Sequence, residues 1–355
     1  MPVLSVDYSR GAATTLLIKD DFSYRILRIP LMSPDIYYAH QKSNSQIFEN
    51  YLKLIEENFS IKLTPDTKLF VSTVKDFGIK HPPSTFCDKS EAFKSLSGID
   101  FIYFGHLHVG SNQGVFSADV SYDEILQELH FDEGKQVIIN YFENLALYPF
   151  IQPSSDRDFY EEEAYLKTIA KKKCQIVNTE PFEQSQKFIF STTRSLDDEL
   201  SLCRFMLLCS ESLCTEGIYE YQLDQFDFVG ASAALSLLDN KTFQRLEFPE
   251  FLTLGTVLNI QDNINCVITD PTSERVEFNL RKGEIFTYPL SDVNKVTLEI
   301  KSENHGPIVK ELRGGVFGLV IDTREKTKSG LLNIDQRKRL IKSWEDSLLH
   351  SMKGL

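Results

Sequence analysis

The alternation of hydrophobic and polar residues near the start of the chain predicts three short strands, at residues 3–6, 14–19 and 23–29. A segment that resembles a helix capping box follows at residues 43–46. Apolar residues then recur at helical spacing, at Ile47, Phe48, Tyr51, Leu54, Ile55 and Phe59. We therefore expect three short strands followed by a helix.

Short apolar runs at residues 69–72 and 101–104 are typical of buried strands. Residues 122–129 have a helical pattern. The aliphatic run at 136–140 and the segment at 145–150 favour two paired strands.

The next part of the chain alternates between helices and strands. An acidic start and three lysines at the end predict a helix through Lys173, because this charge order suits the helix dipole. A strand at 188–191, a helix starting at Ser195, a strand at 219–223 and a helix over 225–238 follow. This alternation indicates an α/β unit that extends to about residue 245.

The pattern changes after Leu246. Strand-like segments at 276–280, 284–288, 296–300 and 316–321 are separated by turn residues. The last helix, Asp335–His350, has one apolar face, which we expect to pack on the preceding strands. The predicted domains are thus an α/β region, 1–245, and a β-rich module with a terminal helix, 246–355.

Composition narrows the class of protein. The 355 residues include 38 Lys and Arg against 51 Asp and Glu, and the net charge of −13 has the wrong sign for a nucleic-acid binder. The six cysteines form no C-x-x-C pair, and no residue spacing matches a zinc site. Because the start of the chain lacks a signal-peptide pattern and no apolar run reaches the about 20 residues of a membrane span, we expect a cytoplasmic protein without direct membrane insertion.

Several motifs resemble one family. They are Phe188–Leu196, Cys214–Ile218, Phe228–Ala234, Arg281–Glu284, Asp335–Trp344 and, most specifically, the Gly-Gly-x-x-Gly-Leu-x-Ile-Asp-x-Arg segment from Gly314 to Arg324. Together they are similar to the MutL (GlmL) family of glutamate mutase accessory proteins, which is unrelated to the mismatch-repair protein of the same name. The resemblance covers residues 186–347, and residues 4–15 resemble the family's opening strand-turn-strand.

This resemblance implies an actin-like (ribonuclease H-like) α/β fold, with two lobes at roughly 1–150 and 151–245 around a nucleotide cleft. In that fold, turns and glycine-rich loops present backbone N–H groups to the phosphates of ATP, and an Asp positions Mg²⁺ or water. The resemblance also implies a protein partner, a subunit of a cobalamin-dependent mutase. An α/β region of 245 residues is short for two such lobes.

The first phosphate loop of the fold would here contain Asp7, Ser9, Arg10, Gly11 and Thr14. The Asp is present, but Ser9 replaces the glycine and Gly11 comes two residues late. Glycine matters there because the backbone must approach a phosphate closely.

The other two loops also depart from the fold's pattern. The best candidate for the second loop places Asn140 where an Asp belongs, and a neutral Asn cannot serve as a base. The alternative location for the second loop is the segment Gly105–Gly114. In the third loop, Thr192 and Thr193 stand where the fold usually has two glycines.

From these departures we expect ATP hydrolysis to be lost, with no cofactor or only weakly bound ATP/Mg²⁺. The predicted function is an accessory or scaffold protein that binds a protein partner, either a mutase subunit or an assembly protein. Two alternatives remain: a pilus- or assembly-associated actin-like protein that docks a membrane partner, and a genuine ATPase with unusual loops.

Three smaller features have simple interpretations. The segment from Gly105 to His108 resembles the Gly-His-x-His end of calcineurin-like metallophosphoesterases, but the other motifs of that family are missing. Asp322 and Arg324 are expected to form a salt-bridged turn. Gly314 and Gly315 are expected to serve turn geometry rather than phosphate binding, because no helix start follows them.

Overall fold

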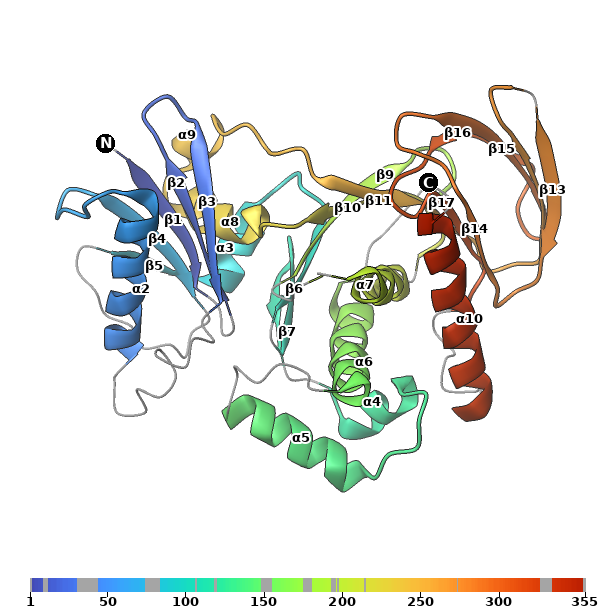
Figure 1. The fold of residues 1–355 in the computed structure, drawn as a ribbon, viewed down its shortest axis with the longest axis horizontal. Coiled ribbons are helices and arrows are strands. Elements are labelled where there is room, and N and C mark those ends of the chain that lie inside the picture. Colours follow the sequence, from blue (N-terminus) through green and yellow to red (C-terminus); the bar gives the residue numbers. More distant parts are fainter. Residues whose placement is uncertain are drawn as a thin grey trace.

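The computed structural model describes residues 2–8, 12–30, 44–73, 84–105, 107–117, 120–147, 155–174, 181–192, 196, 198–213, 215–272, 274–325 and 334–353. Three sheets and the helices around them make up these residues (Figure 1).

The first sheet has five strands in the order β3-β2-β1-β4-β5. Strands β1 to β3 form an antiparallel meander, and β4 and β5 run parallel to β1. Their bounds are β1 Val3–Tyr8, β2 Ala12–Ile18, β3 Tyr24–Pro30, β4 Lys68–Thr73 and β5 Thr85–Asp88. Helix α2, Asn44–Phe59, covers one face of this sheet with Phe48, Tyr51 and Ile55, as its apolar spacing predicts.

The second sheet has eight strands in the order β14-β17-β11-β10-β9-β6-β7-β8. Their bounds are β6 Phe101–Gly105, β7 His108–Ser111, β8 Gly114–Phe116, β9 Gln186–Thr192, β10 Gly217–Asp224, β11 Leu252–Asn259, β14 Ile285–Tyr288 and β17 Leu319–Asp322. Five of these strands repeat the first sheet: β6 to β8 are an antiparallel meander, and β9 and β10 extend it in parallel.

The two sheets therefore share one topology, with β8-β7-β6-β9-β10 repeating β3-β2-β1-β4-β5. This duplication is the arrangement of the actin-like, ribonuclease H-like fold, and the predicted fold class is confirmed. The last strand of the first sheet ends at Asp88, and the first strand of the second sheet begins at Phe101. The chain therefore passes from one sheet to the other well before residue 150. As domain boundaries, residues 150 and 245 stay predictions.

Two helices lie between the two sheets (Figure 1). Helix α3, Lys89–Ser95, follows β5, and helix α8, Phe228–Leu238, follows β10 of the second sheet. Helix α8 packs on β1 and β2 of the first sheet and also contacts α3, while Phe93 of α3 contacts Phe101 of the second sheet. The short α9, Asn240–Phe243, precedes the return of the chain to β11.

Most remaining helices cover the opposite face of the second sheet and enclose the largest apolar core. They are α4 Tyr122–Glu128, α5 Lys135–Leu147, α6 Asp156–Lys173, α7 Glu199–Ser212 and α10 Ile334–Lys353. The terminal helix α10 buries Leu348 and packs on α7 and β14, as its apolar stripe predicts.

The third sheet has four antiparallel strands, in the order β13-β12-β15-β16. These are β12 Ile264–Thr269, β13 Arg275–Leu280, β15 Lys295–Ser302 and β16 Ile308–Arg313. Its apolar face packs on Leu258 and Ile321 of the second sheet. The predicted β-rich module is thus divided, because β11, β14 and β17 complete the second sheet.

The strands predicted at 136–140 and 145–150 are wrong where the structure describes them. Residues 135–147 form helix α5, and residues 148–150 lie outside the described part. The run of Val137, Ile138 and Ile139 favours a strand locally. However, Ile138, Phe142 and Leu145 are also spaced to face one side of a helix, and all three are buried there.

Gly314 and Gly315 lie where two backbone segments meet. The N–H of Gly314 donates to the Ser291 carbonyl at 3.1 Å, and that of Gly315 to the Leu290 carbonyl at 3.0 Å. A Cβ on Gly314 would collide with the Leu290 carbonyl oxygen, whereas a Cβ on Gly306 would meet nothing within 4 Å. Turn geometry and close packing thus account for the glycine pair.

We predict that Gly314→Ala lowers the free energy of unfolding by about 1–3 kcal/mol, because the new methyl group must displace backbone atoms rather than a side chain. Gly306→Ala is the matched control and should stay within about 0.5 kcal/mol. Urea unfolding of both variants measures the difference, and equal stabilities would contradict the assignment.

Candidate functional site

A buried group of polar side chains joins the two lobes around Asp7, at the end of β1. The Asp7 and Lys89 side chains are each only 1% exposed, and Lys89 Nζ lies 2.7 Å from Asp7 Oδ2. The Tyr103 hydroxyl donates to the same oxygen at 3.1 Å, and Ser72 Oγ donates to Oδ1 at 3.4 Å. Because Tyr103 belongs to the second sheet, Asp7 of the first sheet is held by contacts from both sheets.

The local sequence explains the position of Lys89. The Asp88 carboxylate accepts hydrogen bonds from the Ser90 and Glu91 N–H groups, and this cap starts α3 at Lys89. The Lys89 ammonium lies 4.0 Å from the centre of the Tyr103 ring and 5.2 Å from that of Phe93. These aromatic faces and the Asp7 carboxylate together compensate for the buried positive charge.

A second carboxyl group, that of Asp227, lies beside the first. Asp227 accepts hydrogen bonds from Thr14 Oγ1 at 3.0 Å and Ser191 Oγ at 3.1 Å, one from each sheet. Burial raises the pKa of Asp227 well above its usual value, and the negative charge of Asp7 raises it further. A Cβ on Gly230 would clash with both carboxyl groups, so only glycine fits between them.

Two further contacts tie the loop after β10 to this site. Asp224 caps α8, because its carboxylate accepts the N–H groups of Phe228 and Val229 at 2.9 and 2.8 Å. Burial raises the pKa of Asp224. Arg28 of β3 donates to the carbonyl oxygens of Thr192 and Gln225, at 2.9 and 3.3 Å, and so connects the first sheet to the second.

The structure places the predicted site residues as follows. Asp7 and Thr14 lie in the buried group, and the Thr192 carbonyl accepts from Arg28 at its margin. Asn140 does not belong to it: this residue is exposed on α5, where its side chain accepts from Gln136. The remaining predicted residues, Ser9, Arg10, Gly11 and Thr193, lie outside the described part of the chain.

The repeated topology points to a different second loop. The β6–β7 turn occupies the place in the second sheet that the β1–β2 turn occupies in the first. This turn belongs to Gly105–Gly114, the alternative location that the sequence suggested. The His108 ring stacks on Tyr103 at 5.6 Å, and it leaves no room for a Cβ on Gly105. The His108 side chain therefore fills the space beside Gly105.

Sequence reasoning missed Lys89, Tyr103, Ser191, Asp227 and Gly230. The Asp88 to Glu91 segment has a helix-start pattern that could have placed α3. Nothing in the sequence near Lys89 indicates that its ammonium would reach Asp7, 82 residues away.

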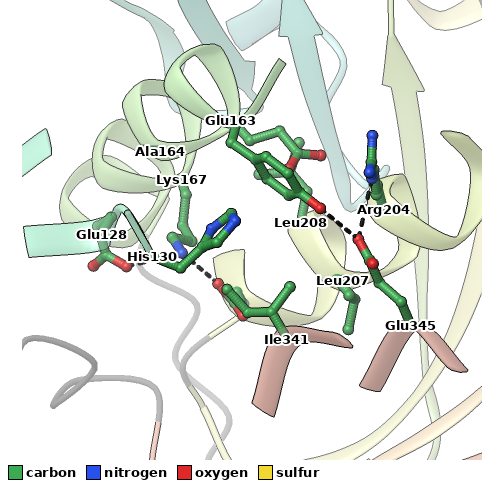
Figure 2. A pocket seen from close by; sticks show the side chains of 12 residues that line it. Glu128, His130, Glu163, Ala164, Lys167, Arg204, Leu207, Leu208, Ile341 and Glu345 are labelled. Atoms are coloured by element: carbon green, nitrogen blue, oxygen red, sulfur yellow. Dashed lines mark hydrogen bonds and ion pairs between the residues drawn. The ribbon is translucent and has the colours of Figure 1, made fainter. Parts of the chain in front are cut away.

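A second charged group surrounds a cavity of about 40 Å³ between α4, α6, α7 and α10 (Figure 2). Lys167 pairs with Glu128 at 2.9 Å and with Glu211 at 2.6 Å. Lys167 and Arg324 lower the pKa of Glu211 to about 2, although burial opposes this shift. These pairs hold the helices together, which is a structural role.

Arg324 extends this network to β17. It pairs with Glu211 at 2.7 Å and with Asp322 at 2.8 Å, and it lies over the Trp344 ring. The predicted Asp322–Arg324 salt bridge is confirmed. Across the described residues there is no group of three or more His, Cys, Asp or Glu side chains arranged to hold a metal ion.

The raised pKa of Asp227 predicts how stability depends on pH. Asp227 keeps its proton to a higher pH in the folded state than in the unfolded state. An unfolded Asp has a pKa of about 4, so the contribution of Asp227 to folding stability falls as the pH rises above this value. Asn has the same shape and no charge. The melting temperature of Asp227→Asn should therefore increase relative to wild type as the pH is raised from 4 to 8.

Thermal unfolding of both proteins across this pH range measures the effect. Asp227→Ala is the control: it loses the Thr14 and Ser191 hydrogen bonds and should be less stable than Asp227→Asn throughout. A difference between Asp227→Asn and wild type that does not change with pH would show that Asp227 is not held in its protonated form.

Comparisons with known proteins add little beyond the fold. No family model and no curated protein sequence matches the chain. Among the described helices, none combines the length and the apolar character needed to cross a membrane.

Solved structures with partial similarity have the actin-like ATPase fold. One is the activator of 2-hydroxyisocaproyl-CoA dehydratase from Clostridium difficile with bound ADPNP. The two sequences are 9% identical, the match covers 70% of this chain and 100% of that chain, and the TM-score is 0.36. Component A of (R)-2-hydroxyglutaryl-CoA dehydratase from Acidaminococcus fermentans is 10% identical. The match covers 68% of this chain and 99% of that chain, with a TM-score of 0.37. A putative N-acetylmannosamine kinase from Listeria monocytogenes has 11% identity, 68% and 100% coverage and a TM-score of 0.33. At such scores and identities, the similarity does not extend to activity, ligand or partner.

Proposed function

We propose that this chain is an actin-like accessory or scaffold protein that binds a protein partner and has little or no ATP hydrolysis. The observation that carries the proposal is the ion pair between Asp7 and Lys89. In the actin-like fold, the Asp at the end of the first strand would face the cation and phosphates of a nucleotide. Here its carboxylate is instead bonded to an ammonium group of the chain itself.

The described residues fit a Mg²⁺–nucleotide poorly. A metal at Asp7 would need its carboxylate oxygens, yet Oδ2 already accepts from Lys89 and Tyr103, and Ser72 bonds to Oδ1. The neighbouring carboxyl group of Asp227 is shifted toward its neutral form, which is a weaker metal ligand. Among the described residues, an ammonium group and two hydroxyl groups thus contact the oxygens that a metal at Asp7 would use, which supports a role without hydrolysis.

A fixed pair of lobes suits a binding role. Asp7, Asp227 and Arg28 each connect the first sheet to the second, Asp227 through its hydrogen bond from Thr14. Separating the two sheets would break these hydrogen bonds. The resemblance of residues 186–347 to the MutL/GlmL family points to a cobalamin-dependent carbon-skeleton mutase as the partner.

Calorimetric titration with millimolar Mg²⁺–ATP tests the proposal. We predict no saturable binding, because no free carboxylate faces a nucleotide at Asp7. Saturable binding by the wild type that disappears in Asp7→Asn, with both proteins folded by circular dichroism, would contradict the proposal and favour an ATPase with unusual loops.

The partner is tested separately by mixing the purified chain with a mutase of this class and following the complex by size-exclusion chromatography. A stable co-eluting complex without added ATP is the expected result. A complex that forms only with ATP would contradict a nucleotide-independent scaffold role.

Substitutions at α3 measure how much the ion pair matters. Lys89→Ala should lower the free energy of unfolding by about 3–5 kcal/mol, because it leaves the Asp7 carboxylate buried without its cation. Lys94→Ala, on the exposed side of the same helix, is the matched control and should change it by less than about 0.5 kcal/mol. Similar losses in both variants would show that the Asp7–Lys89 pair contributes nothing specific.

A further inference from the structure

The charge of the chain is reversed in one short stretch. The whole protein has a net charge of −13, yet residues 326–342 contain six Lys or Arg and a single Asp. Four of these cations, Arg337, Lys338, Arg339 and Lys342, lie in the first nine residues of helix α10. The N-terminal half of α10 is thus a basic surface on an acidic protein, and we call Lys338, Arg339 and Lys342 the basic face of α10.

The basic face is exposed, whereas its neighbour Arg337 is used in packing. Arg337 is half-buried and donates to the Gln127 carbonyl at the end of α4. Lys338, Arg339 and Lys342 are exposed, and α10 lies at the outside of the molecule (Figure 1). The opposite face of the helix packs on α7 and β14, so the basic face is the side that remains for a partner.

These three cations are in no salt bridge among the described residues. None of them forms an ion pair with a carboxylate in the described part of the chain, although Asp335 and Asp346 lie four residues from Arg339 and Lys342. The lysines of the neighbouring helix α6 differ: Lys167, Lys171 and Lys172 each pair with a glutamate, at 2.5–2.9 Å. The chain therefore neutralises one basic cluster and leaves the adjacent one open.

Local stability does not explain the basic face. Lys338 and Lys342 are four residues apart, which places like charges side by side on a helix and is mildly destabilising. Cations are also not favoured toward the start of a helix, where the dipole prefers acids. When a local rule is broken without a compensating contact, a functional reason becomes the better explanation.

The positive potential also extends inward. His130, at the cavity between α4 and α10, has its pKa lowered to about 4, first by burial and then by Lys167, Lys338, Arg204 and Arg337. The side chains that face this imidazole include Glu128 and Glu345, yet the cations still dominate its surroundings.

We propose that the basic face of α10 is the docking surface for an acidic segment of the partner protein, with several Asp or Glu residues close together. The inference rests on the proposed scaffold function and specifies the chemistry of its partner. The exposed positions in the N-terminal half of α10 are charged or polar, and its apolar residues Ile334, Leu340 and Ile341 are half-buried. Further along the helix, Trp344 and Leu348 pack on the protein core. It therefore lacks the apolar face that a membrane-inserting helix needs, and the overall charge opposes nucleic acid.

Fluorescence anisotropy at low salt tests the docking surface directly. The probe is a labelled peptide of alternating Glu and Ser, and the matched probe replaces Glu by Gln. The full-length protein should bind the acidic probe and not the neutral one, and added salt should weaken the binding. Neutralisation in Lys338→Gln/Arg339→Gln/Lys342→Gln should weaken it about tenfold or more.

Lys241→Gln/Lys301→Gln/Arg313→Gln is the control, because it removes the same charge from exposed positions elsewhere. It should weaken binding less than about twofold. Equal losses in both triple variants would show general charge attraction and overturn the proposal. So would tighter binding to phosphatidylserine vesicles or to single-stranded DNA than to the acidic peptide.

The melting temperature gives a second readout. The basic-face variant should melt within about 1 °C of wild type or higher, because the substitutions remove like-charge repulsion and no internal contact. A drop of several degrees would assign the three cations a structural role instead. Loss of peptide binding alone refutes only the docking surface, whereas ATP binding refutes the scaffold function itself.

Discussion

The ion pair between Asp7 and Lys89 is the interaction around which both lobes are organised. It is buried at the meeting point of β1, α3 and β6, and a charge removed from water there is tolerated only with its partner. Tyr103 from the second sheet completes the pair, so the lobes cannot separate without exposing it. Contacts from both sheets thus meet at this buried pair.

The same constraint explains the neighbouring residues. With one negative and one positive charge already buried, a second ionised carboxyl group at Asp227 would be strongly disfavoured, and its pKa is raised accordingly. Gly230 is required because a Cβ at this position of α8 would collide with both carboxyl groups. Thr14 and Ser191, one from each sheet, provide the hydrogen bonds that a buried acid needs.

Much of the secondary structure could be predicted from the sequence, because apolar periodicity records which face of an element is buried. The pattern failed at residues 136–147, where an aliphatic run fits a strand locally and a helix in context. The apolar pattern also does not reveal the order of the strands in a sheet. The β6–β7 turn, which matches the β1–β2 turn of the first sheet, was therefore only the alternative location for the second loop. Asp7 and Thr14 could be identified from the family pattern, but Lys89 and Asp227 reach the site through packing of distant segments, which no local motif records.

A crystal structure grown in millimolar Mg²⁺–ATP would test the central claim most directly. We predict that Lys89 Nζ stays within hydrogen-bonding distance of an Asp7 carboxylate oxygen, with no metal or phosphate between the two sheets. Electron density for Mg²⁺ or a phosphate at Asp7, with the Lys89 side chain displaced, would contradict it.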